Sequence, residues 1–527
     1  MASRKRRISN FPCGLDEEVA QHKPPEELQR SVFDSCFPAL IQARTAPIRT
    51  FCAAALYNPP RSVYRAATTT SSLSFARGSG THMTNPGQHF VAVIGGAISG
   101  SVAAEILADN GIRVAVFEQN TRPYGKIEDG LPRWHVEQRK QEYGRIDARM
   151  KKPNVYFIPS TKLGRDFDLG QLFTWGFSAV ILANGAWRDR ELGIPNEEQF
   201  VGKGLVYQNP FIYWYNHKNE KEYRGPGYET PDETIVVGGG LASIDVVKVL
   251  QLENYERALK ARGIETSMHE LEKGIPEVCK AHGIKSEELG VKGCLLMYRR
   301  REQDMPLAQP PDNATPDQVA KTEMVRQKML RLARDKYLFR VQDRRLTTGV
   351  VVENGRLVGL KVAETKIEGR KAEAIPGSEH EIRAPQVISS IGSVPEKLHG
   401  INMAGEYYTF AGKDVPCYTA MDRVFGVGNV VTGQGNIRVS LVHSQKVTKR
   451  VVDCMKGGDG NAPAGSTAQQ QVASAIGAIG KQIESIPSLS DNQLAAVERQ
   501  VHALQQKAGF TSDYDSWIAK VTPPDLE

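Results

Sequence analysis

The hydrophobic pattern of this chain is organised around two glycine-rich turns. In the first, an apolar run from Phe90 to Ile94 breaks at Gly95, and an alanine-rich helical stretch follows from Ser99 to Asn110. A second apolar run, Arg113 to Phe117, ends in Glu118. This order predicts a strand, a glycine turn, a helix and a second strand with a terminal acid, which is the unit that binds a dinucleotide.

The residues of this turn match that task. Gly95 permits a tight turn, Gly100 lets the helix pack closely on the strand, and the helix N-terminus offers unpaired N–H groups to a pyrophosphate. Glu118 stands where an acceptor for a ribose 2′-OH is expected. The middle glycine of G-x-G-x-x-G is Ala97, with Gly96 beside it, so an ordinary strand-to-helix turn is the alternative.

The second turn repeats the pattern with a different ending. Thr234 to Val237 leads into Gly238 and Gly240, Ser243 takes the place of the third glycine, and an apolar helix is expected from Ile244 to Leu250. We interpret the polar helical stretch 253–289 as an insertion. After it, the apolar run 293–298 ends in three arginines.

The residues at the two strand ends differ in charge, and this difference carries chemistry. A carboxylate such as Glu118 favours a free 2′-OH, as in FAD or NAD. Guanidinium groups such as those of Arg299 and Arg300 favour a 2′-phosphate, as in NADP. The alternative is that the arginines form a solvated charge run.

Further segments extend the α/β pattern. The loop containing Gly125 is expected to pass close to a flat or phosphorylated group, and the strand 177–185 ends at Gly185, which keeps side chains away from a ligand. The remaining expected elements are a helix over 136–150, strands over 154–158, 338–343, 348–353, 356–364, 385–392 and 423–428, a hairpin turn at Asn354 and Gly355, a helix beginning near Arg438, and a C-terminal helical pair.

This pattern predicts an α/β fold with two Rossmann-like dinucleotide-binding domains, the second inserted in the first. The expected divisions are a basic, disordered tail (1–87), the first part of the FAD domain (88–205), the NADPH domain (206–385), the second part of the FAD domain (386–455), and a linker with the C-terminal helical segment (456–527).

Charge and cysteine content narrow the function. Of the formal net charge of +7, residues 1–82 carry +5 (11 basic against 6 acidic residues), so the body is close to neutral and nucleic-acid binding is not indicated. The seven cysteines include no C-x-x-C pair, which argues against a redox-active disulfide, a zinc ribbon and a cysteine-bound iron–sulfur cluster, so no metal site is expected. The same cysteine usage favours a reducing compartment, the cytoplasm. No apolar run is long enough for a membrane span.

The N-terminal tail has several interpretations. Its arginine- and serine-rich, acid-poor second half is typical of an organelle transit segment, which would place the protein in the mitochondrial matrix. A disordered basic tail, or an extension upstream of a start at Met83, would have no targeting function.

From Phe90 to Arg450 the chain resembles the NADPH–adrenodoxin reductases, which are ferredoxin–NADP reductase-like flavoproteins, and next the small subunit of glutamate synthase. The motifs that carry the resemblance are VAVIGGAISG (91–100), RPYG with GLPRWH (122–125 and 130–135), LGIP (192–195), FIYWYN (211–216), VVGGGLASIDVVKVL (236–250), the arginine doublet, and VFGVGN with GQGNI (424–429 and 433–437).

The resemblance implies roles for individual residues. The FAD site would include Gly95, Ala97, Gly100 and Glu118, with Gly428 and Asn429 on the phosphate side and Gly435, Asn436 and Ile437 at the flavin ring; the NADPH site would include Gly238, Gly240, Arg299 and Arg300. His135 would be the catalytic residue near the flavin, with Trp187 or Arg188 at the position of its acidic partner. Asn429 stands where most two-nucleotide flavoproteins have Asp.

The resemblance therefore implies an FAD-dependent oxidoreductase that passes hydride from NADPH to FAD and then single electrons to a ferredoxin-type iron–sulfur protein. An electron-transfer subunit of the glutamate synthase type and a small-molecule reductase are the alternatives. A non-catalytic nucleotide-binding scaffold is a further alternative.

Overall fold

The computed structural model describes residues 86–311, 313–369, 371–412, 416–456, 486 and 488–524. The N-terminal tail, including its transit interpretation, and the predicted linker after residue 456 lie outside these residues, apart from the few positions 86–87, 486 and 488–490. Among the described residues, no helix is long and apolar enough to cross a membrane.

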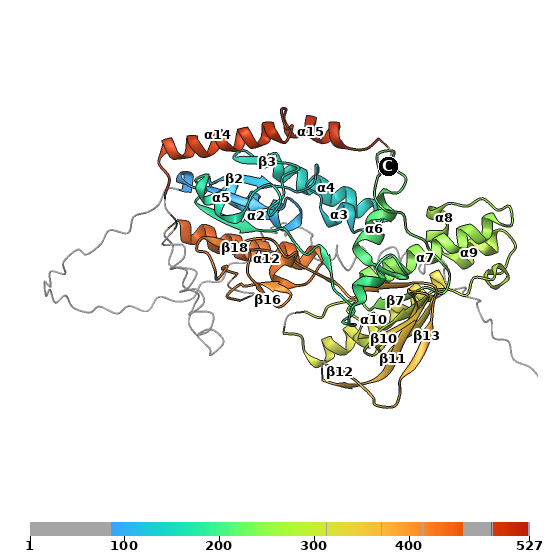
Figure 1. The fold of residues 1–527 in the computed structure, drawn as a ribbon. Coiled ribbons are helices and arrows are strands. Elements are labelled where there is room, and N and C mark those ends of the chain that lie inside the picture. Colours follow the sequence, from blue (N-terminus) through green and yellow to red (C-terminus); the bar gives the residue numbers. More distant parts are fainter. Residues whose placement is uncertain are drawn as a thin grey trace, which may run out of the picture. The chain divides into compact units, whose positions relative to one another are not determined.

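The first glycine turn lies in a five-stranded, fully parallel sheet (Figure 1). Its strands over 90–94 and 179–182 are short apolar runs buried at every residue, as expected for parallel strands that are covered on both faces. In spatial order the strands of this first sheet are β18 (Val424–Gly426), β4 (Ala179–Leu182), β1 (Phe90–Ile94), β2 (Arg113–Phe117) and β3 (Val155–Ile158).

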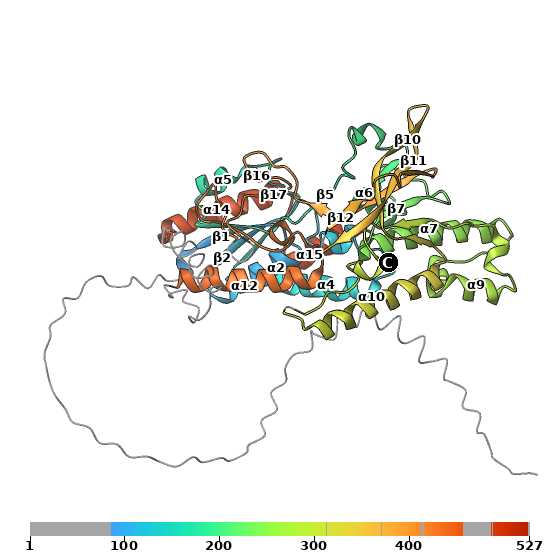
Figure 2. The same ribbon diagram turned by 90° about the horizontal axis from the view of Figure 1, so that it is seen from below.

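Helices cover one face of the first sheet, and mixed elements cover the other. On one face α2 (Ile98–Asp109) packs against α4 (Val136–Met150) and α12 (Ile437–Met455), and Figure 2 shows the three side by side. The other face is covered by α5 (Leu169–Thr174) and by the loops around β16 (Met403–Ala404) and β17 (Tyr407–Tyr408). The short helices α3 (Lys126–Asp129) and α11 (Asn429–Thr432) begin directly after Gly125 and Gly428.

The second glycine turn lies in a second five-stranded parallel sheet, inserted in the sequence between β4 and β18. Its strands in spatial order are β6 (Leu205–Tyr207), β14 (Val387–Ser390), β7 (Ile235–Gly238), β8 (Leu295–Met297) and β9 (Arg340–Gln342). Its helices are α6 (Gln208–His217), α7 (Leu241–Lys260), α8 (Met268–Lys273), α9 (Ile275–Ala281) and α10 (Pro316–Tyr337). The predicted α/β fold with an inserted second parallel sheet is therefore confirmed.

An antiparallel meander follows β9, formed by β10 (Arg345–Glu353), β11 (Arg356–Glu368), β12 (Lys371–Ala374) and β13 (His380–Arg383). The expected turn between β10 and β11 is present: Glu353 pairs with Arg356, and both Asn354 and Gly355 adopt positive φ. Single-turn 3₁₀ helices occur at Pro86–Gln88, Glu197–Phe200, Ser286–Leu289 and Glu302–Asp304.

Two short strands connect the sheets, β5 (Arg188–Asp189) on the way into the insertion and β15 (Ser393–Val394) on the way out, and they pair with each other. The predicted start of the second FAD-domain segment at residue 386 is wrong by one strand. β14 pairs with β6 and β7, so it belongs to the second sheet, and the chain returns towards the first sheet at β15. An isolated apolar run gives no indication of which sheet it joins.

The C-terminal helical pair consists of α14 (Asp491–Lys507) and α15 (Tyr514–Val521), which run along the β3 side of the first sheet (Figure 1). Leu494, Val497 and Val501 of α14 belong to the core on one face of the sheet. Tyr514 and Trp517 of α15 belong to the core on the other face. The predicted helical pair is therefore an integral part of the first domain.

Candidate functional site

The first glycine turn has the backbone that its sequence predicts. Gly95 adopts a φ of +100°, and a Cβ added at Gly100 would lie 1.7 Å from the Gly95 carbonyl oxygen, so only glycine allows α2 to approach β1 this closely. Helix α2 begins after Ala97 with no side chain capping its first turn. Its N-terminal N–H groups therefore remain suited to an anion.

Glu118 lies at the end of β2 with its carboxylate turned back to the turn. Oε2 accepts a hydrogen bond from the Gly96 N–H at 2.8 Å, and Oε1 accepts one from the Asn120 N–H at 2.9 Å. Burial raises the pKa of this carboxyl to about 7, although both backbone hydrogen bonds act in the opposite direction. A ligand hydroxyl that donates to Glu118 would favour its charged form.

The loop after Glu118 closes over the same turn. A Cβ at Gly96 would lie 2.8 Å from Cβ of Pro123, and a Cβ at Gly125 would lie 2.9 Å from Cβ of Ala97. Residues 119–125 therefore form a wall beside the N-terminus of α2. Gly185, which follows β4 at a φ of +68°, has only a Trp187 side-chain atom within 4 Å of the position of a Cβ, so space is open there.

The C-terminal segment of the predicted FAD site meets the same helix end. A Cβ at Gly428 would collide with the Ser99 side chain on α2, and Ser444 of α12 donates a hydrogen bond to the Ser99 carbonyl at 2.7 Å. Asn436 accepts a hydrogen bond from the Val439 N–H, so it caps α12, which begins at Ile437. Gly435 lies beside the Asn429 side chain.

Asn429 provides a direct test of whether this region fits a bound group. Its Oδ1 atom is buried and has no hydrogen-bond partner among the described residues. A buried carbonyl oxygen without a partner is costly, so a hydroxyl donor from a ligand would stabilise it. The residues gathered around the α2 N-terminus therefore fit a polyhydroxylated dinucleotide.

In the second turn the glycines have distinct tasks. A Cβ at Gly238 would lie 2.3 Å from the carbonyl oxygen of Ser390 on β14, and one at Gly239 would lie 2.4 Å from the Tyr298 ring. A Cβ at Gly240 would meet no other described atom within 4 Å beyond its chain neighbours and the backbone of its own helix. Gly240 therefore provides the open approach to α7, a 20-residue helix whose first turn has no side-chain cap.

Ser243, which takes the place of the third glycine, lies where α7 packs against β14. Its hydroxyl donates to the Ser390 carbonyl at 3.0 Å, and the side chain is fully buried. Ser243 thus joins α7 to β14, and this small side chain permits the close helix–strand contact expected at the third position of the turn.

The three arginines after β8 divide into two groups. Arg301 makes two hydrogen bonds of 3.0 Å to the Asp304 carboxylate, which ties it to its own turn. Arg300 lies 3.6 Å from the same carboxylate and keeps about a quarter of its side chain exposed, and Arg299 is exposed. Because Tyr298 packs on Gly239, Arg299 and Arg300 follow directly beside the second turn.

His135 has an acidic partner that its sequence motif does not predict. Its Nε2 lies 3.4 Å from Oδ1 of Asp245, which is on the first turns of α7. The expected partner positions, Trp187 and Arg188, do not take this role. The sequence contains one sign of this partner: Asp245 is an acidic residue within an otherwise apolar helical run, five residues after Gly240.

The contact between the segment 134–135 and α7 is reinforced by a buried cation. Lys248 of α7 lies 4.1 Å from the centre of the Trp134 ring and donates a hydrogen bond to Glu272 at 2.7 Å. Burial lowers the pKa of Lys248 to about 8. His135 and Trp134 are thus held by the helix that begins at the second turn.

Two glycine turns of the dinucleotide-binding type lie on two parallel sheets, and the paired strands β5 and β15 connect these sheets. Together they define a fold of the two-domain dinucleotide-binding kind. Residues 89–287 match the sequence profile of the pyridine nucleotide-disulphide oxidoreductase family.

The predicted resemblance is confirmed by individual relatives. The chain is 24% identical over 380 residues to the small chain of glutamate synthase [NADPH] from Escherichia coli, which covers 69% of this chain and 68% of that protein. It is 28% identical over 162 residues to the mitochondrial NADPH:adrenodoxin oxidoreductase of Arabidopsis thaliana, a match that spans 30% of this chain and only 32% of the plant protein.

Solved structures share the fold. The structure of Mycobacterium tuberculosis FprA in complex with NADPH aligns with 79% of this chain and 99% of its own length, at a TM-score of 0.53 and 17% sequence identity. The arrangement of the two sheets is therefore that of a known two-domain fold.

Proposed function

We propose that this protein is an FAD-dependent NADPH oxidoreductase whose first glycine turn binds FAD and whose second binds NADPH. The observation that carries the proposal is the contrast between the two strand ends. The buried Glu118 carboxylate accepts from the Gly96 N–H, while the exposed Arg299 and the partly exposed Arg300 lie beside the second turn. The first arrangement suits a free ribose hydroxyl, and the second suits a 2′-phosphate.

The chain's own residues would position the cofactors. The N-termini of α2 and α7 would face the two pyrophosphates, and Asn429 Oδ1 would accept from an FAD hydroxyl. His135 and Asp245 would handle a proton where the two domains meet. When bound, FAD supplies the chemistry that turns a two-electron hydride donor into a source of single electrons.

The proposed acceptor is a ferredoxin-type iron–sulfur protein, in keeping with the name of the adrenodoxin oxidoreductase relative. A second candidate is an electron-transfer subunit of the glutamate synthase type, favoured by the longer match to that relative. Reduction of cytochrome c by the purified protein with NADPH tests the choice. We expect a rate that depends on added ferredoxin; an equal rate without ferredoxin would contradict the proposed acceptor.

The affinity for FAD is expected to depend on pH through Glu118. The pKa of this carboxyl is raised to about 7 by burial, and ribose hydroxyls that donate to the carboxylate would lower it in the complex. Binding then releases a proton below pH 7, so affinity should rise by up to about tenfold per pH unit towards pH 7 and level off above it.

This dependence can be measured by FAD fluorescence titration between pH 5.5 and 8.5. The Glu118→Gln variant cannot release that proton, so its affinity should be independent of pH over the same range. A wild-type profile as flat as that of the variant would mean that Glu118 does not contact the cofactor.

The pair of His135 and Asp245 is expected to affect the reductive step. Replacing Asp245 by Asn keeps the size of the side chain but removes its charge beside His135 Nε2. We expect the rate of flavin reduction by NADPH to fall by at least about tenfold, because positioned proton-handling groups contribute this much or more. Stopped-flow absorbance measures the rate, and FAD content should be unchanged. An unaltered rate would leave the pair a purely structural contact.

A further inference from the structure

The C-terminal helices α14 and α15, with the loop 508–513 between them, form what we call the C-terminal clasp. They pack on opposite faces of the first sheet, α14 through Val497 and Val501 and α15 through Tyr514 and Trp517. The loop therefore passes around the outer side of β3, the edge strand of the sheet.

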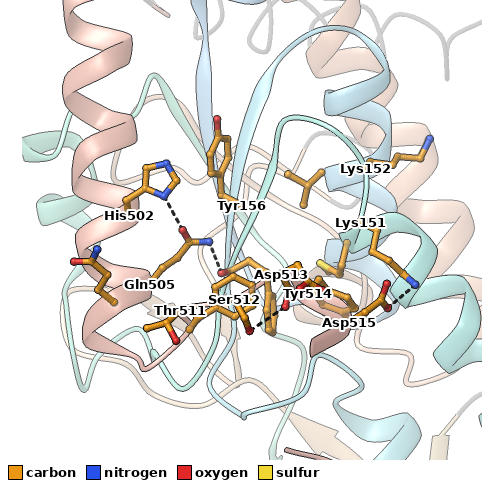
Figure 3. Close-up of a pocket in the computed structure, with 15 residues that line it drawn as sticks. Lys151, Lys152, Tyr156, His502, Gln505, Thr511, Ser512, Asp513, Tyr514 and Asp515 are labelled. Carbon is orange, nitrogen blue, oxygen red and sulfur yellow. Dashed lines mark hydrogen bonds and ion pairs between the residues drawn. The ribbon is translucent and has the colours of Figure 1, made fainter. Parts of the chain in front are cut away.

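The clasp is fixed to that edge by specific contacts. Gln505 of α14 donates a hydrogen bond to the Phe157 carbonyl at 2.9 Å, which pairs a backbone group of the edge strand. Lys151, just after α4, forms an ion pair of 2.7 Å with Asp515. An open cavity of about 580 Å³ lies between β3 and the clasp. Gln505, Lys151 and Asp515 line it (Figure 3).

Two contacts go beyond the edge and reach the wall of the proposed FAD site. The Trp517 indole N–H donates to the Thr121 carbonyl at 2.8 Å. The Tyr514 hydroxyl lies 2.7 Å from Oδ1 of Asp147, and the Tyr124 hydroxyl binds the same oxygen at 3.0 Å. Thr121 and Tyr124 both belong to the loop 119–125, which follows Glu118 and covers the first glycine turn.

The clasp therefore supports this loop from the side opposite the turn. On the inner side Pro123 packs on Gly96 and Gly125 packs on Ala97. On the outer side Trp517 is buried in the same core as Tyr124 and Ile127. A loop held on both sides loses little freedom when a ligand binds, whereas a loop released on the outer side would have to be ordered at that moment.

We propose that the C-terminal clasp is a cofactor-retention element, in which Trp517 and Tyr514 act as positioning residues that hold the loop 119–125 against the turn and so slow the release of FAD. This inference rests on the proposed binding of FAD to the first turn. The clasp lies more than 350 residues after the glycine turn in the sequence, and this inference makes it part of the same site.

The test measures the rate at which FAD leaves the holoprotein, followed by the rise in fluorescence of free FAD. Trp517→Phe keeps an aromatic ring but removes the N–H donor, and Tyr514→Phe removes only the hydroxyl. We expect each variant to release FAD about fivefold faster than the wild type, since a single buried hydrogen bond has an effect of this order. The dissociation constant for NADP⁺, which would bind the other turn, should not change.

Leu172→Ala is the matched control. Leu172 lies on α5, outside the clasp and on the opposite face of the sheet from Trp517, so its loss should lower the melting temperature without changing FAD release. If the phenylalanine variants release FAD at the wild-type rate, or only as fast as L172A, the inference is wrong.

Hydrogen exchange of the apoprotein separates this inference from the proposed function. W517F should raise the exchange rate of the amides in 119–125 whether or not FAD binds, and unchanged protection of these amides would overturn the inference. A wild-type protein that binds no FAD would refute the proposed function, and the exchange experiment would then still decide whether the clasp holds the loop.

Discussion

Replacing Arg299 and Arg300 together by alanine is expected to lower the preference for NADPH over NADH by about 100-fold, measured as the ratio of the two kcat/KM values. Hydrogen bonds between charged groups contribute about 1.5–3 kcal/mol each, and two of them together account for a factor of this size. The loss of preference should come from a lower kcat/KM for NADPH, because NADH has no 2′-phosphate for the arginines to bind.

Arg301 provides the control for this experiment. It carries the same charge one position further along, but Asp304 already holds its guanidinium through two hydrogen bonds. Arg301→Ala should therefore change the preference by less than about threefold, since a partly exposed ion pair contributes little. A double variant that keeps the wild-type preference would show that these arginines do not bind the 2′-phosphate.

Replacing Gly100 by alanine is expected to destabilise the first domain by about 3 kcal/mol, because overpacking at a site that cannot relax has costs of this size. The added Cβ would lie 1.7 Å from the backbone oxygen of Gly95, and a backbone atom cannot turn aside as a flexible side chain can. Relief requires α2 to move away from β1, which would also displace the N–H groups that we assign to FAD. Thermal unfolding and FAD content measure the two effects.

Gly144→Ala is the same substitution in the neighbouring helix α4, where nothing lies within 4 Å of the new Cβ. It should leave FAD content unchanged and raise stability by up to about 1 kcal/mol, because alanine favours the helix more than glycine does. Equal stability of G100A and G144A would contradict the close packing of α2 on β1.

The parts of the fold that depend on neighbouring residues could be predicted from the sequence. The strand over Phe90–Ile94, the strand over Arg113–Phe117 and the helix over Val136–Met150 occur with the predicted bounds, and the turn at Asn354 and Gly355 occurs where expected. Each is specified by a short periodic pattern or by residues that tolerate positive φ.

Features that depend on contacts between distant segments could not be predicted. The run around Val387–Ser390 reads equally well as a strand of either sheet, and only its pairing with β6 and β7 decides. Helix α7 extends from Leu241 to Lys260, well into the stretch taken for an insertion, and α10 was not predicted at all. Its long polar surface obscures the apolar stripe formed by Met329, Leu330 and Ala333.

The same limit applies to the candidate site. The glycines and Glu118 are close in sequence or at a characteristic spacing, so their grouping at one turn could be predicted. Asp245 lies 110 residues from His135, and Trp517 lies 396 residues from Thr121. No spacing rule connects such pairs, because the sheet topology and the connecting strands β5 and β15 decide which residues meet.

We propose that one chain binds FAD at its carboxylate-ended turn and NADPH at its arginine-ended turn, and that the two cofactors approach closely enough for hydride transfer. Anaerobic titration of the purified protein, followed by its visible spectrum, tests this most directly. We expect a yellow protein with one FAD per chain that loses its colour on addition of about one equivalent of NADPH and far more slowly with NADH. A colourless protein that takes up no added FAD, or a bound flavin that NADPH does not bleach, would contradict this proposal.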